Sequence, residues 1–203
     1  MTARPAGSRR RQPTEVRRRM VLEAVVELVA ERGVQGTGIR DIAAAAGVSV
    51  GTVTYHFSGV REILSEALTV QLAAYYDPLL ERAAALPAAE GLDLLLAAVL
   101  DEATRPHWML WFECWQTGMW DSGFAGAQDE RYAGWHDALR ALLARGHADG
   151  VLHCPDPEGT ASRLVALIDG LALQRLRGVP PVSSERAVGH LRAAVAGWTR
   201  LSV

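Results

Sequence analysis

The first strong pattern along the chain is a helical spacing of apolar residues with Glu and Arg between them. Apolar side chains recur at intervals of three and four positions at Val21, Ala24, Val25, Leu28 and Val29. This spacing places them on one face of a helix. Pro13 and Thr14 mark where the helix begins and Gly33 where it stops. An amphipathic helix is therefore predicted between these positions.

Two shorter helices are predicted directly downstream. Thr37 precedes the first, over residues 38–46, as an N-cap, and Gly47 ends it. The positions of this helix with inward-facing spacing are Ile39, Ile42, Ala43 and Ala46. Ser49 then caps a second helix over residues 50–57. Two short helices joined by a tight turn containing Gly form a helix-turn-helix unit, whose second helix can enter a DNA major groove.

The rest of the chain has helical spacing nearly to its end. Helices are predicted over residues 61–76, 91–103, 107–119, 128–146, 158–176 and 184–200. Pro78 breaks the first of them, a loop covers residues 121–126, and residues 150–157 hold a brief extended piece. Because no alternating strand pattern of useful length occurs, the fold is predicted to be all-α.

The turn between the two short helices carries a specific motif. Residues 33–64 read GVQGTGIRDIAAAAGVSVGTVTYHFSGVREIL. The Thr-capped helix, the Ala-Gly-Val-Ser turn and the helix ending in Tyr-His-Phe make roughly residues 14–64 resemble the TetR family of bacterial transcriptional regulators. Residues 1–13 carry four arginines with Pro and Gly and no apolar periodicity, so they are expected to form a flexible Arg-rich arm. The resemblance implies a helix-turn-helix DNA-binding domain (14–62) and a larger helical ligand-binding and dimerisation domain (63–203).

The residue types of this segment suit contact with DNA. Ser49 can accept hydrogen bonds from the first amides of the second helix, whose N-terminus favours a phosphate. Gly51 and Thr52 are small enough for close approach to the groove floor, and Thr54 can touch a thymine methyl or a base edge. The resemblance implies that bases or sugars face Arg40, Val50, Gly51, Thr52 and Thr54, and that phosphates face Thr37, Tyr55 and His56.

The segment departs from the family at Val60. The family usually places a phosphate-binding Lys there, three residues after Phe57, and Arg61 is predicted to take its role. Phe57 and Val53 are predicted to be core residues. Only Arg40 can clamp a guanine with two hydrogen bonds, so specificity is expected to depend on DNA shape and on the basic arm as well.

Short motifs suggestive of other functions lack the necessary context. Residues 47–51 spell G-x-S-x-G, the nucleophile elbow of hydrolases, but they follow a predicted helix and not a buried strand. The glycines at residues 36–38 lack the strand and the third glycine of a dinucleotide site. No metal-ligand spacing links His136, His147, His153, Cys114 and Cys154. No catalytic residue, metal ligand or cofactor is therefore predicted.

The charge distribution qualifies the near-neutral total of −2. All 21 basic residues are arginine. Residues 1–61 hold ten of them against five acidic residues, a formal +5, and residues 62–203 hold eleven against eighteen, a formal −7. A polyanionic partner is therefore expected at the N-terminal part, because the acidic remainder repels phosphate.

Features of compartment and targeting are few. Two cysteines cannot build a disulfide framework, so a reducing cytoplasm is expected. Glu23 and Glu27 interrupt what would be the apolar region of a signal peptide. Residues 42–60 form the longest stretch without Asp, Glu or Arg, and they are too polar to span a bilayer. No membrane partner is expected.

Four of the six tryptophans lie within residues 108–120. Aromatic faces beside a carboxylate bind ammonium groups, and each cation–π contact is worth roughly 0.5 to 2 kcal/mol. Packing of these rings in the core is the alternative interpretation. Residues 110–174 are also similar to the C-terminal domains of the choline-responsive BetI-type branch, which implies a pocket for a small molecule, by hypothesis an amine or a flat aromatic ligand. The candidate ligand-binding residues are Trp108, Trp111, Glu113, Trp115, Met119, Trp120, Trp135 and Asp169.

The last two predicted helices offer a dimer interface. By resemblance to the family, they form a four-helix bundle with those of a second copy through Val165, Ile168, Ala172, Val188, Leu191, Val195 and Trp198. Packing within one chain is the alternative, but two recognition helices that read a palindrome require a dimer. The sequence thus predicts a dimeric repressor that a small molecule releases from its operator. Control by a protein partner and an all-α enzyme, for which no acid/base set is visible, are the alternative functions.

Overall fold

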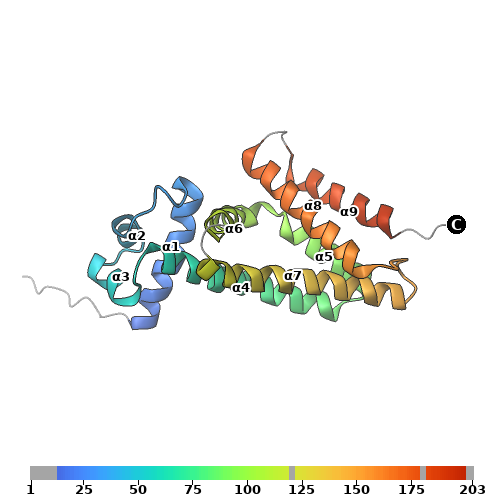
Figure 1. The fold of residues 1–203 in the computed structure, drawn as a ribbon, viewed down its shortest axis with the longest axis horizontal. Helices are drawn as coiled ribbons and strands as arrows, with labels where there is room; N and C mark the ends of the chain where they lie inside the picture. The colour runs from blue at the N-terminus through green and yellow to red at the C-terminus, as the bar shows by residue number, and fades with distance from the viewer. Residues whose placement is uncertain (1–12, 119–121, 179–181, 200–203) are drawn as a thin grey trace, which may run out of the picture.

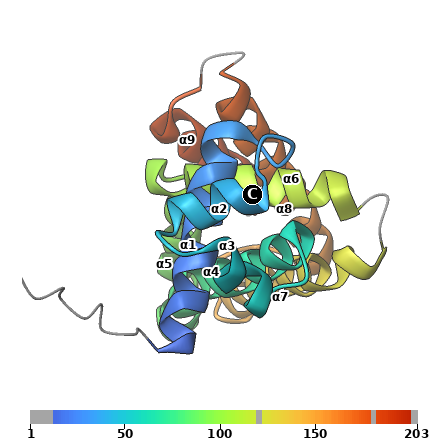
Figure 2. The ribbon, with the colours of Figure 1, turned by 90° about the vertical axis from the view of Figure 1, so that its left-hand side faces the viewer.

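The computed structural model describes residues 13–118, 122–178 and 182–199, which contain helices and no strand. This confirms the predicted all-α fold. At one end of the molecule lies an N-terminal unit of three helices (Figures 1 and 2). These are α1 (Thr14–Arg32), α2 (Ile39–Ala45) and α3 (Val50–His56). The next helix, α4 (Val60–Ala85), runs from this unit into the larger one, so the predicted domain boundary after residue 62 falls inside a helix that both units share.

The larger unit packs the remaining helices around the far part of α4, with α8 and α9 side by side in Figure 1. They are α5 (Ala88–Val99), the 3₁₀ turn η1 (Glu102–Thr104), α6 (Arg105–Gly118), α7 (Ser122–Ala148), α8 (Pro157–Arg177) and α9 (Ser184–Trp198). Asp156 and Ser183 cap α8 and α9 with their side chains, and Gly178 ends α8 in the left-handed conformation. Local cap chemistry therefore sets the bounds of both helices.

The apolar stripe predicted for α1 forms the core of the N-terminal unit. Val21, Val25 and Val29 are fully buried in one cluster with Val53 and Phe57. The N-cap predicted for α2 is wrong by one residue. Gly38 occupies that position, and its amide donates to Asp41, whereas the buried Thr37 hydroxyl donates back to the carbonyl of Gly33.

The helix break predicted at Pro78 does not occur, because α4 continues through this residue to Ala85. A proline inside a helix removes one donor. Beyond it, however, Leu79 and Ala83 are buried, and α4 contacts α5 and α7. The guanidinium of Arg145 also donates to the carbonyl oxygens of Ala84 and Leu86, 2.7 and 2.6 Å away. Tertiary packing thus extends a helix that local sequence interrupts.

Other helix boundaries also differ from the predicted ones. Residues 91–103 divide into the end of α5 and the separate turn η1, because Asp101 caps that turn. Helix α7 begins at Ser122, within the predicted loop. Residues 150–157 contain no strand. Short polar segments beside helices are therefore the parts that spacing alone defined least well.

Gly91 marks a close approach between helices. A Cβ atom there would lie 2.3 Å from the carbonyl oxygen of Ala83 and 2.9 Å from Cδ2 of Leu142. Gly91→Ala is therefore expected to lower the free energy of unfolding by about 1–3 kcal/mol. Chemical denaturation measures it against Gly126→Ala, where no atom lies within 4 Å of the added Cβ. Equal stability of the two variants would contradict this packing.

Candidate functional site

Helix α3 presents one face to solvent and buries the other. Ser49 Oγ accepts a hydrogen bond from the amide of Thr52 at 3.1 Å, so the predicted N-cap is formed. Val53 and Phe57 are buried beneath it, whereas Val50 and Tyr55 are 42% and 79% exposed. An apolar side chain and a phenol so exposed on a short helix form a surface available to a partner.

The other predicted DNA-binding residues surround this face. Figure 2 looks onto this end of the molecule, where α2 and α3 lie toward the viewer. Arg40 on α2 and Arg61 at the start of α4 are exposed, and His56 is half-buried. Thr37 is the one predicted contact whose side chain turns inward, as its hydrogen bond to Gly33 requires. The remaining ones are exposed or half-buried: Ser49, Val50, Gly51, Thr52, Thr54 and Tyr55.

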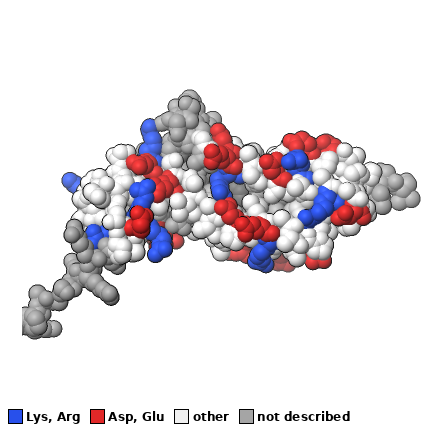
Figure 3. All heavy atoms as spheres, turned by 90° about the horizontal axis from the view of Figure 1, so that it is seen from below, with Lys and Arg blue, Asp and Glu red and all other residues white. Residues whose placement is uncertain are grey.

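Charge on the larger unit is mixed. Seen from below, acidic side chains gather over the middle of the molecule and alternate with arginines (Figure 3). This agrees with the formal −7 of residues 62–203. The described residues 13–61 hold six arginines against five acidic residues, so by formal charge the N-terminal unit is better suited to a polyanion than the larger one.

Arg18 of α1 holds the end of α3, a role that spacing did not reveal. Its Nε donates to Oε1 of Glu66 at 2.8 Å, and a second nitrogen contacts the other oxygen of the same carboxylate. Its Nη1 donates to the carbonyl of His56 at 3.1 Å, and the guanidinium carbon lies 4.6 Å from the centre of the Phe57 ring. Three consecutive arginines occur at residues 17–19, and the sequence gives no sign of which one turns inward.

Arg18→Ala is expected to lower the free energy of unfolding by about 1–3 kcal/mol, because Glu66 and a helix-terminal carbonyl lose their partner. Arg19→Ala removes the same charge from a far more exposed pair, Arg19 with Glu23, whose nearest N and O atoms are 3.8 Å apart. That control should change stability by about 0.5 kcal/mol at most. Thermal unfolding compares the two variants, and equal losses would show that the Arg18 contacts contribute nothing specific.

A cavity of about 180 Å³ lies inside the larger unit, bounded by residues of α4 to α8. Aromatic rings form one part of its wall: Tyr76, His107, Trp108, Trp111, Tyr132 and Trp135. Aliphatic side chains complete the wall: Leu72, Leu80, Val99, Val165 and Ile168. Such an apolar cavity with a few polar groups is typical of a small-molecule site.

The aromatic rings of the cavity pack against one another. Tyr76 meets Trp135 edge-to-face with ring centroids 5.6 Å apart, and Trp111 stacks against Tyr132 at 6.2 Å. His107 lies edge-on to Tyr76 at 5.8 Å. Rings held by such contacts present fixed π faces to a ligand, which is the arrangement that binds organic cations.

The charged groups of the cavity make it negative. Asp169 is half-buried, and desolvation raises the pKa of its carboxyl to about 6 although the Tyr132 hydroxyl donates to it at 3.4 Å. Arg131 is paired with Asp77 at 2.5 Å, and Glu130 adds a third carboxylate. Three carboxylates against one guanidinium favour a cation over an anion.

The cavity wall also includes residues with buried side-chain nitrogens that have no hydrogen-bond partner. Among the described residues, buried side-chain nitrogens without a hydrogen-bond partner occur at Trp111, Trp135 and His107, and all three line the cavity. Burial lowers the pKa of His107, which favours the neutral ring, and Nδ1 of a neutral ring donates or accepts according to the tautomer. Buried donors are normally paired in folded proteins. A bound molecule with a hydrogen-bond acceptor would satisfy groups that the chain itself leaves open.

The predicted ligand residues divide by position. Trp108, Trp111, Trp135 and Asp169 line the cavity. Trp115 packs on the rings of Trp111 and Tyr132 behind the wall. Glu113 points toward α1, since a Cβ on Gly33 would lie 3.5 Å from its carboxylate. Neither Glu113 nor Trp115 is among the residues that line the cavity. Met119 and Trp120 lie outside the described residues.

Spacing did not identify the cavity residues Tyr76, Tyr132 and His107. Tyr132 precedes Trp135 by one helical turn, which is a usable signal. Leu80 lines the cavity from the part of α4 beyond Pro78, where no helix was predicted. The pairing of Tyr132 with Asp169 joins residues 37 positions apart, and no local pattern reports such a contact.

The predicted dimer residues mostly face their own chain. Six of the seven are buried in the single chain and form no outer surface: Val165, Ile168, Ala172, Val188, Leu191 and Val195. Val165 and Ile168 line the cavity. Only Trp198 is exposed, at 38%. The exposed positions of α8 and α9 include charged residues, such as Arg163 and Arg192, the apolar Leu173, and a set of small residues: Ala166, Gly170, Gly189, Ala193 and Gly197.

Within residues 13–118, 122–178 and 182–199, no group of three or more His, Cys, Asp or Glu side chains is arranged to hold a metal ion. None of the described helices combines the length and apolar character needed to cross a bilayer.

Comparisons with known proteins agree on one group. Residues 21–67 match the family described as bacterial regulatory proteins, tetR family, and residues 87–199 match the C-terminal domain of BetI-type transcriptional repressors. The regulator PksA of Bacillus subtilis is 29% identical over 180 residues, which cover 85% of this chain and 84% of PksA. BetI of Burkholderia ambifaria is 26% identical over 178 residues, covering 86% and 89%.

A solved structure is similar over nearly the whole chain. It is a putative transcriptional regulator from Saccharomonospora viridis in complex with choline, with a TM-score of 0.85 and 28% sequence identity. The match covers 92% of this chain and 98% of that one.

Proposed function

The chain belongs to the TetR family of bacterial transcriptional regulators, and we propose that it is a dimeric repressor released from a palindromic operator by a small organic cation. This family does not consist of enzymes, so the all-α enzyme alternative is set aside. One observation carries the proposal: a negatively charged aromatic cavity lies in the same chain as an exposed, capped recognition helix. Because the operator is chromosomal DNA, a cytoplasmic location is part of the proposal.

The proposed DNA contacts come from the N-terminal unit. Val50, Gly51, Thr52 and Thr54 of α3 approach base edges, with Arg40 of α2 beside them. The capped start of α3 at Ser49 faces a phosphate, as do Tyr55, His56 and Arg61. The Arg-rich arm at residues 1–13 supplies further phosphate contacts, whose strength falls as salt rises.

The proposed ligand is a small organic cation that carries a hydrogen-bond acceptor. The rings supply cation–π faces and Asp169 the counter-charge. The unpaired indole N–H groups of Trp111 and Trp135 favour a hydroxyl or carbonyl oxygen on the same molecule. At about 180 Å³, the cavity is smaller than the pockets of roughly 300–1,000 Å³ that hold drug-sized ligands. The choline complex of the Saccharomonospora viridis regulator supports this class, so choline is the first probe to use.

Helix α6 joins the two sites. Trp108 and Trp111 line the cavity, and α6 also contacts α1, where Glu113 lies close to Gly33. A ligand that shifts α6 would move the N-terminal unit and so change the spacing of the two recognition helices. Ligand and operator must then weaken each other by the same factor.

The outer faces of α8 and α9 form the proposed dimer interface. Ala193→Arg is expected to raise the dimer dissociation constant at least about 100-fold, because an unpaired charge would enter a close interface near its two-fold mate. Sedimentation velocity measures the effect, with Ala141→Arg, at an exposed position on α7, as the matched control. A dimer unchanged by Ala193→Arg would place the interface elsewhere.

The proposed function is tested by fluorescence anisotropy with the DNA upstream of the gene that encodes this chain. The expected result is saturable binding at low salt that added choline or a related cation weakens. Binding that no small molecule alters would favour the alternative of control by a protein partner. Failure to bind any palindromic DNA at low salt would overturn the proposal.

A further inference from the structure

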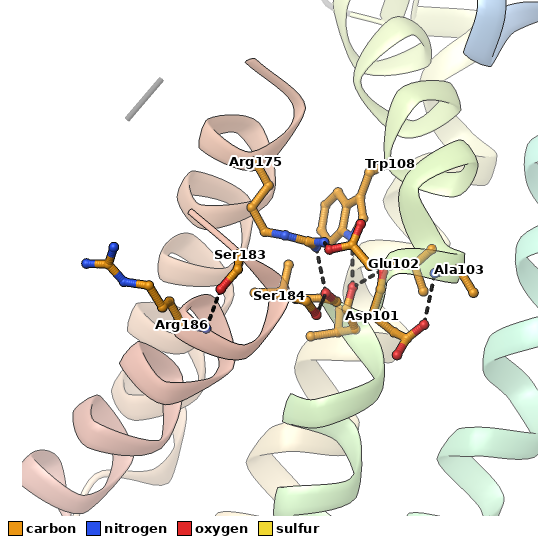
Figure 4. A network of polar contacts seen from close by, with 11 residues as sticks. Asp101, Glu102, Ala103, Trp108, Arg175, Ser183, Ser184 and Arg186 are labelled. Carbon is orange, nitrogen blue, oxygen red and sulfur yellow. Dashed lines mark hydrogen bonds and ion pairs between the residues drawn. The ribbon is translucent and has the colours of Figure 1, made fainter. Parts of the chain in front are cut away.

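The C-terminal end of α5 is a junction between the cavity and the last two helices (Figure 4). The last carbonyl groups of a helix have no partner within it. Here the carbonyl of Val99 accepts from the indole nitrogen of Trp108 at 2.7 Å and from the hydroxyl of Thr104 at 3.2 Å. Trp108 is also part of the cavity wall. One terminal carbonyl of α5 is therefore tied to a ligand-facing ring.

The next carbonyl along the chain is tied to α8 and α9. Leu100 accepts from Nη1 of Arg175 at 2.6 Å and from the hydroxyl of Ser184. Only 8% of the Arg175 side chain is exposed, and its other terminal nitrogen donates to Glu102 at 2.6 Å. Figure 4 shows Arg175 and Trp108 converging on this short segment from opposite elements.

The two carbonyls belong to neighbouring peptide planes that share the Cα atom of Leu100, so a rotation of one plane turns the other unless φ and ψ of Leu100 compensate. A rotation of Trp108 that withdraws its indole from Val99 would turn the planes at the end of α5. Leu100 is fully buried, and its carbonyl would then lose alignment with Arg175 and Ser184. A buried charge-assisted hydrogen bond costs more to leave unmade than an exposed one. Helices α8 and α9 would therefore shift with the Leu100 carbonyl, so that Arg175 and Ser184 keep their hydrogen bonds to it.

We infer that this junction transmits ligand binding to α8 and α9, with Arg175 as the positioning residue that carries the coupling. The inference rests on the proposed function, because it assumes that α8 and α9 form the dimer interface. The junction provides a second connection between the ligand cavity and the DNA-binding unit, in addition to the direct contact of α6 with α1. The ligand changes the angle between the two chains as well as the position of the N-terminal unit within each.

The first test compares three proteins by operator binding with and without saturating choline. The wild type should lose at least about fivefold in operator affinity when choline is added. Arg175→Met keeps the apolar stem and removes the donors, and should respond less than twofold while its own choline affinity stays within about twofold of the wild type. Arg192→Met breaks another link between α9 and α5, the exposed pair with Asp93 at 2.5 Å, and should respond like the wild type. A full response in Arg175→Met would overturn the inference.

The second test needs no ligand. Operator affinity is measured for Trp108→Phe, for Arg175→Met and for the double variant, because Phe keeps the ring and loses the indole donor. Coupled residues should give a double-variant effect that differs at least about threefold from the product of the single effects. Additive effects would overturn the inference even if choline proves not to be the ligand, which separates its failure from that of the proposed function. Arg175→Lys, which keeps the charge, should restore part of the coupling if Arg175→Met is too unstable to study.

Discussion

A Val50→Glu variant is expected to lose at least about 100-fold in operator affinity without loss of stability. Val50 is the first residue of α3 and is 42% exposed. A carboxylate there would face the DNA, and like-charge contact costs several kcal/mol, of which about 2.7 kcal/mol already gives 100-fold. The same carboxylate at a helix N-terminus stabilises the helix by roughly 0.3–1 kcal/mol. The loss of binding therefore cannot come from unfolding.

Val70→Glu is the matched control for this experiment. Val70 lies on α4 and is 41% exposed, so it accepts the same new charge at the same exposure away from α3. Anisotropy titration gives the operator affinities, and thermal unfolding gives the stabilities. Equal operator affinity in the two variants would show that α3 is not the helix that approaches DNA.

An Asp169→Asn variant is expected to be more stable than the wild type and to lose its response to choline. Raising the pKa of this carboxyl from 3.8 to about 6 means that the fold favours its neutral form. Ionisation at pH 7.5 then lowers stability by up to about 3 kcal/mol, and the amide avoids this loss. The stability gain of Asp169→Asn should disappear below about pH 4, where the wild-type carboxyl is protonated in the folded and in the unfolded protein alike.

The choline affinity should follow the ionisation of Asp169. In the wild type the affinity should rise with pH through about 6 and level off above it, since the cation needs the carboxylate. In Asp169→Asn the choline affinity should be weak at every pH. Asp129→Asn removes the same charge from an exposed position on α7, and its choline affinity should match that of the wild type. Calorimetry over pH 5–8 checks this. A variant that binds choline as the wild type does would exclude Asp169 as the counter-charge.

The sequence predicted best the parts of the chain whose structure is decided locally. The cap at Ser49, the stop at Gly33 and the apolar stripe of α1 depend on neighbours within one or two helical turns. The cavity could be predicted only in part. Trp108 and Trp111 were visible on one helical face, but Leu80 needed the passage of α4 through Pro78, which tertiary packing decides.

The faces of α8 and α9 show the same limit. Both helices are apolar or small on two sides, so spacing does not say which side meets the chain's own core. The larger side chains, such as Ile168 and Leu191, fill that core. The small ones, such as Gly170 and Ala193, are left outside. Ala172 and Ala187 are buried as well, whereas Leu173 and Trp198 are exposed, so neither size nor hydrophobicity alone decides which residues face the core.

The central claim is that the cavity and the recognition helix are energetically linked. The most direct measurement determines four dissociation constants: operator with and without choline, and choline with and without operator. The predicted result is that each partner weakens the other by the same factor of at least about five. Choline binding in the cavity that leaves operator affinity unchanged would contradict the claim.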